Sequence, residues 1–255
     1  MSEHQVYALK FAGPLTSSGA LLMWFKEWEE KAQRGYYIWC IQSEQQAVVV
    51  DAGVAPSLAA ERKLAGYVDP AAMMERLGTP ADQVEHLVLT HLHWDHINGV
   101  SLFPNATIYV QESEYRFWTQ NPLAHRPPFA SLADREALDF LASLQGSSRL
   151  VLTQGDQEIL PGIRCVLAPG HSIGHQAVAV NTGEGTIILA SDCGHLFRNF
   201  KEDWPSSIFV DMASLLLTYD KLRAYATSPD LIFPGHDLLM TDNFPQVAED
   251  ITRLA

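Results

Sequence analysis

The most restrictive feature of this chain is a run of metal-ligand side chains in the stretch VEHLVLTHLHWDHINGV, residues 84–100. Four of them stand within six positions: His91, His93, Asp95 and His96. Imidazoles and a carboxylate packed this tightly would repel each other's protons and lose hydration unless a cation shared their lone pairs. A divalent metal meets that need, so the stretch predicts a metal site.

The position of this cluster in the chain indicates the edge of a sheet. The run Leu-Val-Leu-Thr at residues 87–90, just before it, is typical of a short buried strand. The cluster therefore follows the carboxyl end of a strand, where α/β sheets place their sites. His91 and His93, two residues apart, can face one ion. Asp95 and His96 continue round the turn, which indicates a second ion.

Three further strand ends offer ligands for two ions. His171 follows a strand that ends near Ala168 in APGHSIGH, and Asp192 follows the strand TIILA in LASDCGH. His236 follows the apolar LIF in IFPGHD. In each segment an apolar strand leads into a small or kinked residue and then a ligand, as expected of an open site at a sheet edge. The joint pattern is much more specific than any one segment.

Some nearby polar residues are expected to support the ligands rather than bind metal. Asp51 ends the strand in AVVVDAG, and a carboxylate there is expected to accept the free N–H of a histidine ligand. For His175, four residues after His171, orienting a ligand and simple packing are both open. His86 and His125 are expected to be structural or surface residues.

Composition excludes several classes of partner. The formal charge of −13 argues against nucleic acid, because phosphate backbones are bound by clustered Lys and Arg, and none cluster here. No apolar run approaches membrane-spanning length and no signal peptide is evident, so no membrane partner is expected and the cytoplasm is the expected location. The cysteines Cys40, Cys165 and Cys193 show no close pairing, so no disulfide framework is indicated.

Predicted strands and helices follow one another along the whole chain, which favours an α/β fold in one domain, residues 1–255, with two β-rich halves. Strands are expected at residues 5–11, 36–42, 47–53, 87–90, 106–111, 149–154, 163–169, 176–182, 186–192 and 230–237. Residues 13–19 are expected to form a turn or loop, and residues 55–82 and 211–227 to be helical. A helical insertion at 113–146, broken by prolines, is expected to supply a wall or lid over the site.

Residues 20–35 contain an unusual apolar cluster: Leu21, Leu22, Met23, Trp24, Phe25 and Trp28. One interpretation is a helix or loop packed on the core. The other is that part of the cluster lines a substrate cleft or contacts a second copy of the chain in a homodimer, because exposed aromatic patches usually mark an interaction site.

The segments HLHWDH, PGHSIGH, LASDCGH and FPGHD, in this order and after VVVDAG, resemble the motifs of the metallo-β-lactamase superfamily. Within it, the chain is similar to the N-acyl homoserine lactone lactonase and 4-pyridoxolactonase group over nearly its whole length. The resemblance implies an αβ/βα four-layer sandwich and seven metal ligands. These are His91, His93 and His171 for one ion, Asp95, His96 and His236 for the other, and Asp192 as the bridge.

Histidine and carboxylate ligands without a thiolate suit two zinc ions and also accept iron, cobalt or manganese. Two ions can share one water and lower its pKa toward ~7, so the expected nucleophile is a bridging hydroxide that opens a lactone ring. The residues expected to be catalytic are Asp95, Asp192 and His195. Lactonases of this group often carry a tyrosine where this chain has His195, which can also donate a hydrogen bond or a proton.

The expected substrate is a small-molecule lactone or related ester, but other chemistries are open. One is hydrolysis of another ester, thioester or amide, as in glyoxalase II and β-lactamase relatives. Another is an iron-dependent oxidation, as in the persulfide dioxygenase or flavodiiron branches, which the complete ligand set and the absence of an appended flavin domain disfavour. A non-catalytic binding protein is disfavoured because no ligand position is lost.

Overall fold

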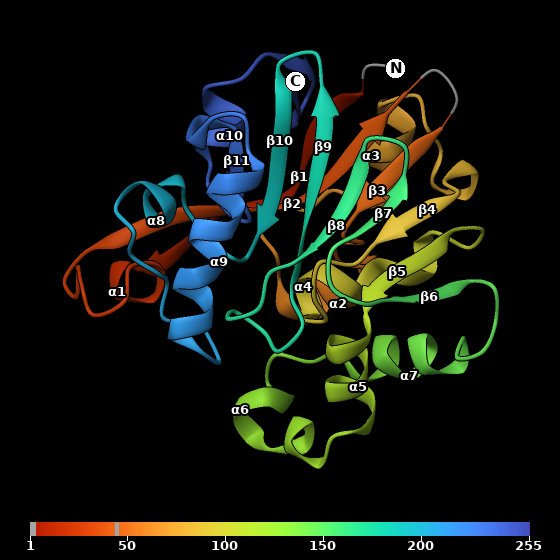
Figure 1. Ribbon diagram of the computed structural model, residues 1–255, viewed down its shortest axis with the longest axis horizontal. Helices are drawn as coiled ribbons and strands as arrows, with labels where there is room; N and C mark the ends of the chain where they lie inside the picture. Colours follow the sequence, from red (N-terminus) through yellow and green to blue (C-terminus); the bar gives the residue numbers. More distant parts are fainter. Residues whose placement is uncertain (1–3, 44–45) are drawn as a thin grey trace.

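Two β-sheets packed face to face form the centre of the molecule (Figure 1). The computed structural model describes residues 4–43 and 46–255. In spatial order, the larger sheet contains β12 (Gln246–Ala248), β13 (Ile251–Arg253), β1 (Gln5–Ser18), β2 (Lys31–Gln42), β3 (Ala47–Val50), β4 (His86–Val88), β5 (Thr107–Gln111) and β6 (Leu150–Thr153). The smaller sheet contains β11 (Ile232–Pro234), β10 (Gly185–Ser191), β9 (Gln176–Thr182), β8 (Ile163–Leu167) and β7 (Gln157–Leu160).

The larger sheet is buried on both faces, and the alternation of its side chains separates two cores. In β1, Val6 and Ala8 pack between the two sheets, whereas Leu9 and Phe11 face the helices. Successive side chains of a strand point to opposite faces, so both sets must be apolar here. This is why β2 has an almost continuous apolar run, YYIWCI, instead of an alternating one.

Helices cover the outer faces of both sheets (Figure 1). Those between β3 and β6 in the chain are α2 (Pro56–Arg62), α3 (Pro70–Arg76), η1 (Ala81–Gln83), α4 (Trp94–Ile97), η2 (Asn98–Leu102), α5 (Glu112–Gln120), η3 (Pro122–His125), α6 (Pro127–Ala130) and α7 (Arg135–Ser143). The others are α1 (Gly19–Leu22), α8 (Phe197–Lys201), α9 (Met212–Tyr225), η4 (Pro229–Leu231) and α10 (Leu239–Asp242). Because α9 packs on the smaller sheet through Leu215, Tyr219 and Leu222, the layers run helix, sheet, sheet, helix. The expected αβ/βα four-layer sandwich is confirmed.

Strand direction brings several loops to the same edge. β3, β4, β5 and β6 run parallel in the larger sheet, and β10 runs parallel to β11 in the smaller one. The loops that leave the carboxyl ends of β4, β8, β10 and β11 carry the predicted ligands. This arrangement agrees with the prediction of a site at the ends of strands.

The first hairpin differs most from expectation. Residues 13–19, expected to form a loop, continue β1 as far as Ser18, paired with β2. Gly13 and Pro14 lie at the second of two register shifts in this ladder, and Gly13 has a φ of 113°, whereas Ser17 and Ser18 pair in regular register. Residues 20–35 form only the short α1 before β2 begins at Lys31. β7, β12 and β13 were not predicted, and residues 44–45 of the turn expected between β2 and β3 lie outside the described residues.

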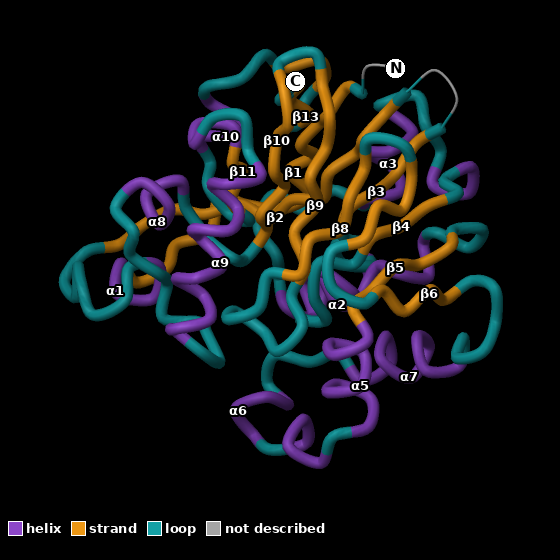
Figure 2. Tube along the Cα trace, in the orientation of Figure 1, coloured by secondary structure: helices purple, strands orange, loops and turns teal. Residues whose placement is uncertain are grey.

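The strands near the two ends of the chain are neighbours (Figure 2). β1 pairs antiparallel with β13, with Tyr7 opposite Arg253. This pairing joins the two C-terminal strands, β12 and β13, to a sheet whose other strands come from the first 153 residues. Among the described helices, none is long and apolar enough to cross a membrane.

Candidate metal centre

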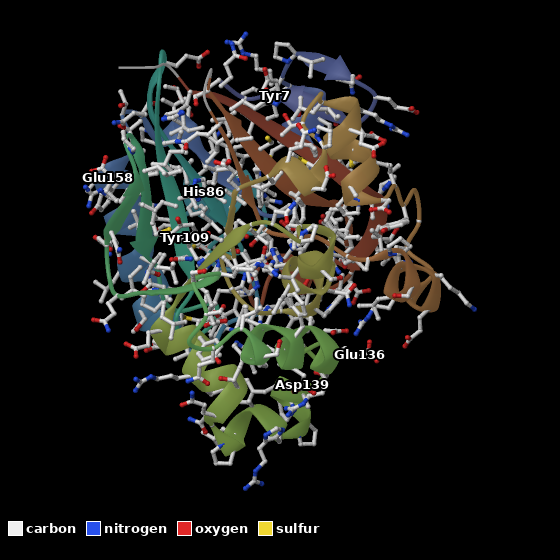
Figure 3. All side chains as sticks on the ribbon, turned by 90° about the vertical axis from the view of Figure 1, so that its right-hand side faces the viewer. Tyr7, His86, Tyr109, Glu136, Asp139 and Glu158 are labelled. Atoms are coloured by element: carbon white, nitrogen blue, oxygen red, sulfur yellow. The ribbon has the colours of Figure 1, made fainter. Side chains whose placement is uncertain are left out.

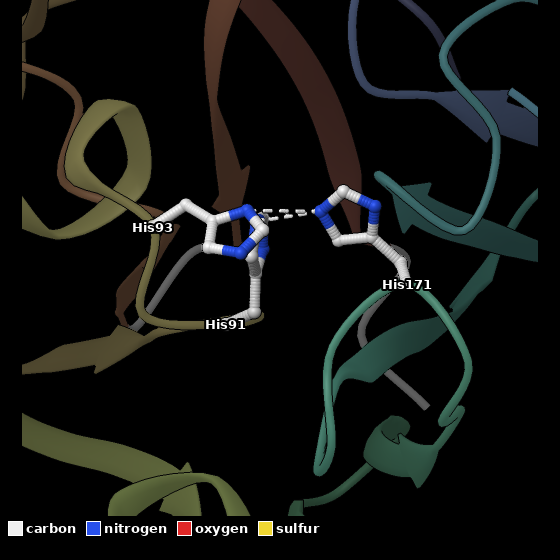
Figure 4. Close-up of side chains that lie close together, drawn as sticks. All are labelled: His91, His93 and His171. Carbon is white, nitrogen blue, oxygen red and sulfur yellow. Dashed lines mark hydrogen bonds between the residues drawn. The ribbon is translucent and has the colours of Figure 1, made fainter. Parts of the chain in front are cut away.

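The first group of predicted ligands is a triangle of buried histidines (Figure 4). His93 Nδ1 lies 3.0 Å from His91 Nε2 and 3.0 Å from His171 Nε2, and the two Nε2 atoms are 3.2 Å apart. Burial lowers the pKa of His91 and His93 well below the usual value, so these imidazoles are neutral and offer lone pairs. Ring nitrogens about 2.0–2.1 Å from a tetrahedral zinc lie about 3.3 Å apart, so the triangle fits such an ion.

Hydrogen bonds at the far side of two ligand rings select the nitrogen that faces the site. His171 Nδ1 donates to the carbonyl of Ile208 at 2.8 Å, and His236 Nδ1 donates to the carbonyl of Gly35 at 2.8 Å. In each ring the proton is therefore on Nδ1, and the lone pair of Nε2 points toward the other ligands.

The second group contains Asp95, His96 and His236. Asp95 Oδ2 lies 3.6 Å from His96 Nε2 and 3.8 Å from His236 Nε2. His96 Nε2 is buried and has no hydrogen-bond partner among residues 4–43 and 46–255. Because buried polar atoms are normally partnered, this free nitrogen beside a carboxylate fits a cation.

Asp192 lies between the two groups. Its Oδ1 is 3.1 Å from His236 Nε2 and 3.6 Å from His96 Nε2, and its Oδ2 is 3.5 Å from His171 Nε2. Burial would raise the pKa of Asp192, but the imidazoles of His236, His195 and His96 hold it well below the usual value. Gly235 lets the carboxylate sit here, because a Cβ at this position would collide with Asp192 Oδ1.

Asp51 supports the site from behind, as predicted. Its Oδ2 lies 2.7 Å from His96 Nδ1, and its carboxylate also accepts hydrogen bonds from the Thr90 N–H at 2.7 Å and from the Ser191 hydroxyl at 3.2 Å. Burial would lower the pKa of His96, but the charges of Asp95, Asp51 and Asp192 raise it well above the usual value. The 2.7 Å contact, in which Asp51 accepts the Nδ1–H, orients His96, and the expectation for this residue is confirmed. The carboxylates that raise the pKa of His96 favour positive charge at this ring, which a metal ion at Nε2 would supply in place of a proton.

Glu114, on α5, is a supporting residue that the sequence did not reveal. It is fully buried, and its Oε1 accepts from the Leu92 N–H at 3.1 Å and from Trp118 Nε1 at 2.7 Å. Its Oε2 accepts from the Ser172 hydroxyl at 2.8 Å and from the Gly174 N–H at 2.7 Å. One carboxylate thus joins the loop of His91 and His93 to the loop of His171. The insertion was predicted to form a wall, but nothing in its sequence distinguishes Glu114 from its exposed neighbours.

The sequence predicts supporting or structural roles for three other histidines: His175, His86 and His125. The ring of His175 packs against a ligand, since it stacks on His91 at 4.9 Å between centroids, with an angle of 28°. His86 lies outside the ligand groups, with its Nδ1 3.1 Å from the Tyr109 hydroxyl (Figure 3). His125, in η3, does not line the cavity described below. The structural roles expected for His86 and His125 agree with these positions.

A cavity of about 120 Å³ opens onto the ligands. Besides the ligand side chains and His195, it is lined by Arg34, Tyr36, Trp94, Leu132 and Ile208. Leu132 comes from the insertion, so the predicted wall is confirmed.

The apolar cluster of residues 20–35 does not contribute to this wall. Leu22 and Met23 are buried in the core, whereas Phe25 and Trp28 are 67% and 63% exposed. None of the six apolar residues lines the cavity, so of the open interpretations core packing fits Leu22 and Met23 and a cleft lining is not found at this cavity. The extended β1–β2 hairpin explains this, because it places Arg34 and Tyr36 of β2 beside the ligands instead. A contact of the exposed Phe25 and Trp28 with a second copy of the chain stays a prediction.

His195 faces the cavity beside Asp192. Its Nε2 lies 3.5 Å from Asp192 Oδ2, and its Nδ1 is buried without a hydrogen-bond partner among the described residues. Burial lowers the pKa of His195 well below the usual value. The ring is therefore neutral and carries one N–H. His171, Asp192 and His195 also form a group with the spacing of metal ligands, which the sequence did not suggest.

The three cysteines are predicted to be unreactive in the folded protein. All are free and buried, and burial raises the pKa of Cys40 and of Cys165 to about 12 and that of Cys193 well above the usual value. Because the thiolate is the reactive form, a disulfide reagent such as DTNB should release well under one equivalent of thiolate from native protein. The same protein in denaturant should release three equivalents, and rapid labelling of the native form would contradict the buried positions.

Comparison with known proteins agrees with this geometry. The sequence is 26% identical over 219 residues to N-acyl homoserine lactonase AiiA of Bacillus thuringiensis subsp. kurstaki, covering 79% of this chain and 81% of the relative. It is 29% identical over 189 residues to N-acyl homoserine lactonase AttM of Rhizobium radiobacter, covering 72% and 68%.

Solved structures share the fold. An N-acyl homoserine lactone hydrolase with N-hexanoyl-L-homoserine bound at its catalytic metal centre superposes with a TM-score of 0.78, at 20% identity, over 97% of this chain and 98% of that one. AidC, a dizinc quorum-quenching lactonase, superposes with a TM-score of 0.70, at 16% identity, over 92% and 88%. The family model of the metallo-beta-lactamase superfamily matches residues 33–236, which is most of the sequence and includes every predicted ligand. The chain belongs to the metallo-beta-lactamase superfamily.

Proposed function

We propose that this protein is a dinuclear metal-dependent hydrolase that opens the ring of a small-molecule lactone, as one domain spanning residues 1–255. The observation that carries the proposal is the position of the Asp192 carboxylate between two groups of buried ligand atoms. The names of the relatives, N-acyl homoserine lactonases, support a lactone as the substrate class.

The proposed ligands are His91, His93 and His171 for one ion, Asp95, His96 and His236 for the other, and Asp192 for both. Zinc is the metal that suits this set of nitrogen and oxygen donors, and AidC, with two zinc ions, supports that choice. Two such ions supply Lewis acidity, which activates water at neutral pH and polarises a carbonyl oxygen.

Side chains of the cavity would position the substrate and handle its protons. The neutral imidazole of His195 would donate its N–H to the carbonyl oxygen or to the oxygen that leaves when the ring opens. The ionised Asp192, with its Oδ2 3.5 Å from His195 Nε2, could take a proton from the attacking water and return it to the leaving oxygen. Leu132 and Ile208 supply apolar walls that limit access of bulk water.

Elemental analysis of the purified protein should find about two divalent ions per chain, because the ligand atoms form two groups that share Asp192. Removing the metal with a chelator should abolish hydrolysis, and adding back zinc should restore it. A fully active preparation that holds at most one ion per chain would contradict the dinuclear proposal.

Steady-state rates on a panel of substrates should identify the reaction. Lactones are expected to give the highest kcat/KM, above thioesters and above a cephalosporin, which would be preferred by hydrolases of the rival classes. A higher kcat/KM for a thioester or a β-lactam would show that the protein is a hydrolase of that class and not a lactonase. Consumption of oxygen by an iron-loaded preparation, without hydrolysis, would indicate an oxidoreductase.

A further inference from the structure

Arg34 and Tyr36 are held beside the predicted metal ligands by the backbone of β2. They are two residues apart and so lie on the same face of the strand, where both line the cavity. Between them, the Gly35 N–H donates to the His236 carbonyl at 2.9 Å, and Gly35 accepts from His236 Nδ1 at 2.8 Å. The ring of Tyr36 meets that of His236 edge to face, at 5.1 Å and 88°. The position of Arg34 is therefore tied to that of a ligand.

The guanidinium of Arg34 is oriented but not neutralised. Its Nε donates to the Ser17 hydroxyl at 2.8 Å, and its Cζ lies 4.8 Å from the centre of the Tyr36 ring. Ser17 takes the Nε–H, and the Tyr36 hydroxyl also interacts with the guanidinium, whose five N–H donors leave others for a ligand. Within residues 4–43 and 46–255, no ion pair includes Arg34, whereas Arg198 and Arg223 each pair with a carboxylate at 2.8 Å. Arg62 and Arg149 also have no ion pair among the described residues, but neither lines the cavity, whereas Arg34 does, beside the ligands. A free guanidinium in that position can bind an anionic group.

We propose that Arg34 binds a carboxylate group of the substrate, so that the lactone or ester opened here is anionic. A guanidinium donates two parallel hydrogen bonds to a carboxylate, which fixes both the position and the orientation of the bound group. This inference rests on the proposed function, and it names the substrate class for that site. The metal site would hold the scissile carbonyl, and Arg34, which lies beside the ligands in the same cavity, would hold the carboxylate.

The size of the cavity supports a small substrate. Its volume of about 120 Å³ is well below the roughly 300–1,000 Å³ of pockets that take drug-sized ligands. A lactone ring with one short substituent needs little space, whereas a long acyl chain would extend beyond the cavity. With few apolar atoms to bury, a compact substrate gains affinity and specificity from a charged contact such as that of Arg34.

The test compares two matched lactones on the metal-loaded protein: a γ-butyrolactone with a ring carboxylate, and its primary carboxamide of the same size. The wild-type protein should prefer the carboxylate by at least about tenfold in kcat/KM. Arg34→Met should lower kcat/KM for the carboxylate by about 10- to 100-fold and that for the carboxamide by less than about threefold. Arg34→Lys keeps the positive charge but cannot donate two parallel hydrogen bonds. Its kcat/KM for the carboxylate should lie between that of wild type and that of Arg34→Met.

Arg62→Met is the matched control. Arg62 is an exposed arginine whose guanidinium lies 3.9 Å from the ring of Trp94, a cavity residue, but Arg62 itself does not line the cavity. Arg62→Met removes one positive charge near the site, as Arg34→Met does, but no group that lines the cavity. The rates on both lactones should therefore stay within about threefold of wild type. Equal losses on both lactones in Arg34→Met, or no preference in the wild type, would overturn the proposal.

Calorimetry separates this inference from the proposed function. Ring opening of the carboxylate lactone yields a hydroxydicarboxylate, and its Kd for the metal-loaded protein should rise about tenfold or more in Arg34→Met but not in Arg62→Met. If neither lactone is hydrolysed while this difference in Kd is seen, the proposed function fails and the carboxylate site stands. If both lactones are hydrolysed and the Kd of the product does not change in Arg34→Met, the proposed function stands and the carboxylate site fails.

Discussion

Replacing Asp192 with asparagine should lower turnover of a lactone by on the order of 100-fold or more and should weaken metal retention, with little change in fold. The carboxylate lies between the two ligand groups, with Oδ1 3.1 Å from His236 Nε2 and Oδ2 3.5 Å from His171 Nε2. An amide of the same shape is neutral, and only its oxygen can bind a cation, so it cannot serve both groups. The loss should therefore exceed that expected for a residue that only orients a ligand.

The measurement is the ion content per chain after dialysis, together with kcat at saturating metal. Asp69→Asn is a suitable control, because Asp69 caps α3 by accepting from the Ala71 N–H and asparagine caps helices equally well. This control should keep both turnover and metal content. Near-normal turnover of Asp192→Asn with both ions retained would show that another residue bridges them, and His195, which groups with His171 and Asp192, would be the first to examine.

The metal-type residues of the site could be predicted from the sequence because each follows a strand. An apolar strand that ends in a small or kinked residue places the next side chain at the sheet edge, so local patterns were enough for His171, Asp192 and His236. The same argument located Asp51, because β3 and β4 are parallel neighbours and the Asp51 N–H donates to the Val88 carbonyl.

The rest of the site depends on contacts between distant segments. Arg34 reaches the cavity because β1 and β2 pair beyond Gly13, with Leu15 opposite Arg34, where the sequence indicates a loop. Tyr36 lies in a predicted strand, but its place beside the ligands depends on contacts with distant residues. Glu114 reaches Leu92 and Gly174 because the helix that carries it packs under two loops, 22 and 60 residues away along the chain. Local periodicity contains no information about such distances, which is why neither set was predicted.

Glu114→Gln should lower the free energy of unfolding by about 3 kcal/mol. The glutamine NH₂ would face buried hydrogen-bond donors, which would then have no acceptor. All four groups around the carboxylate donate: the N–H groups of Leu92 and Gly174, the Trp118 indole and the Ser172 hydroxyl. Burial raises the pKa of Glu114, but these four donors favour the ionised form. A glutamine has one oxygen for them and turns its NH₂ toward the others. Gly174 is packed closely against this helix, since a Cβ at its position would collide with Ser113 and with the backbone of Glu114.

Thermal unfolding in the presence of a chelator isolates this effect from metal binding. At roughly 2–4 °C per kcal/mol for a chain of this size, the Tm of Glu114→Gln should fall by roughly 6–12 °C. Glu112→Gln is the matched control on the same helix, because Glu112 is only partly buried and pairs with Arg116 at the surface, so its loss should cost less than about 0.5 kcal/mol. With metal restored, Glu114→Gln should also bind the ions about 10- to 100-fold more weakly, because the loop of His91 and His93 is no longer tied to that of His171. An unchanged Tm together with unchanged metal affinity would mean that the two loops are held in place by the sheet edges alone.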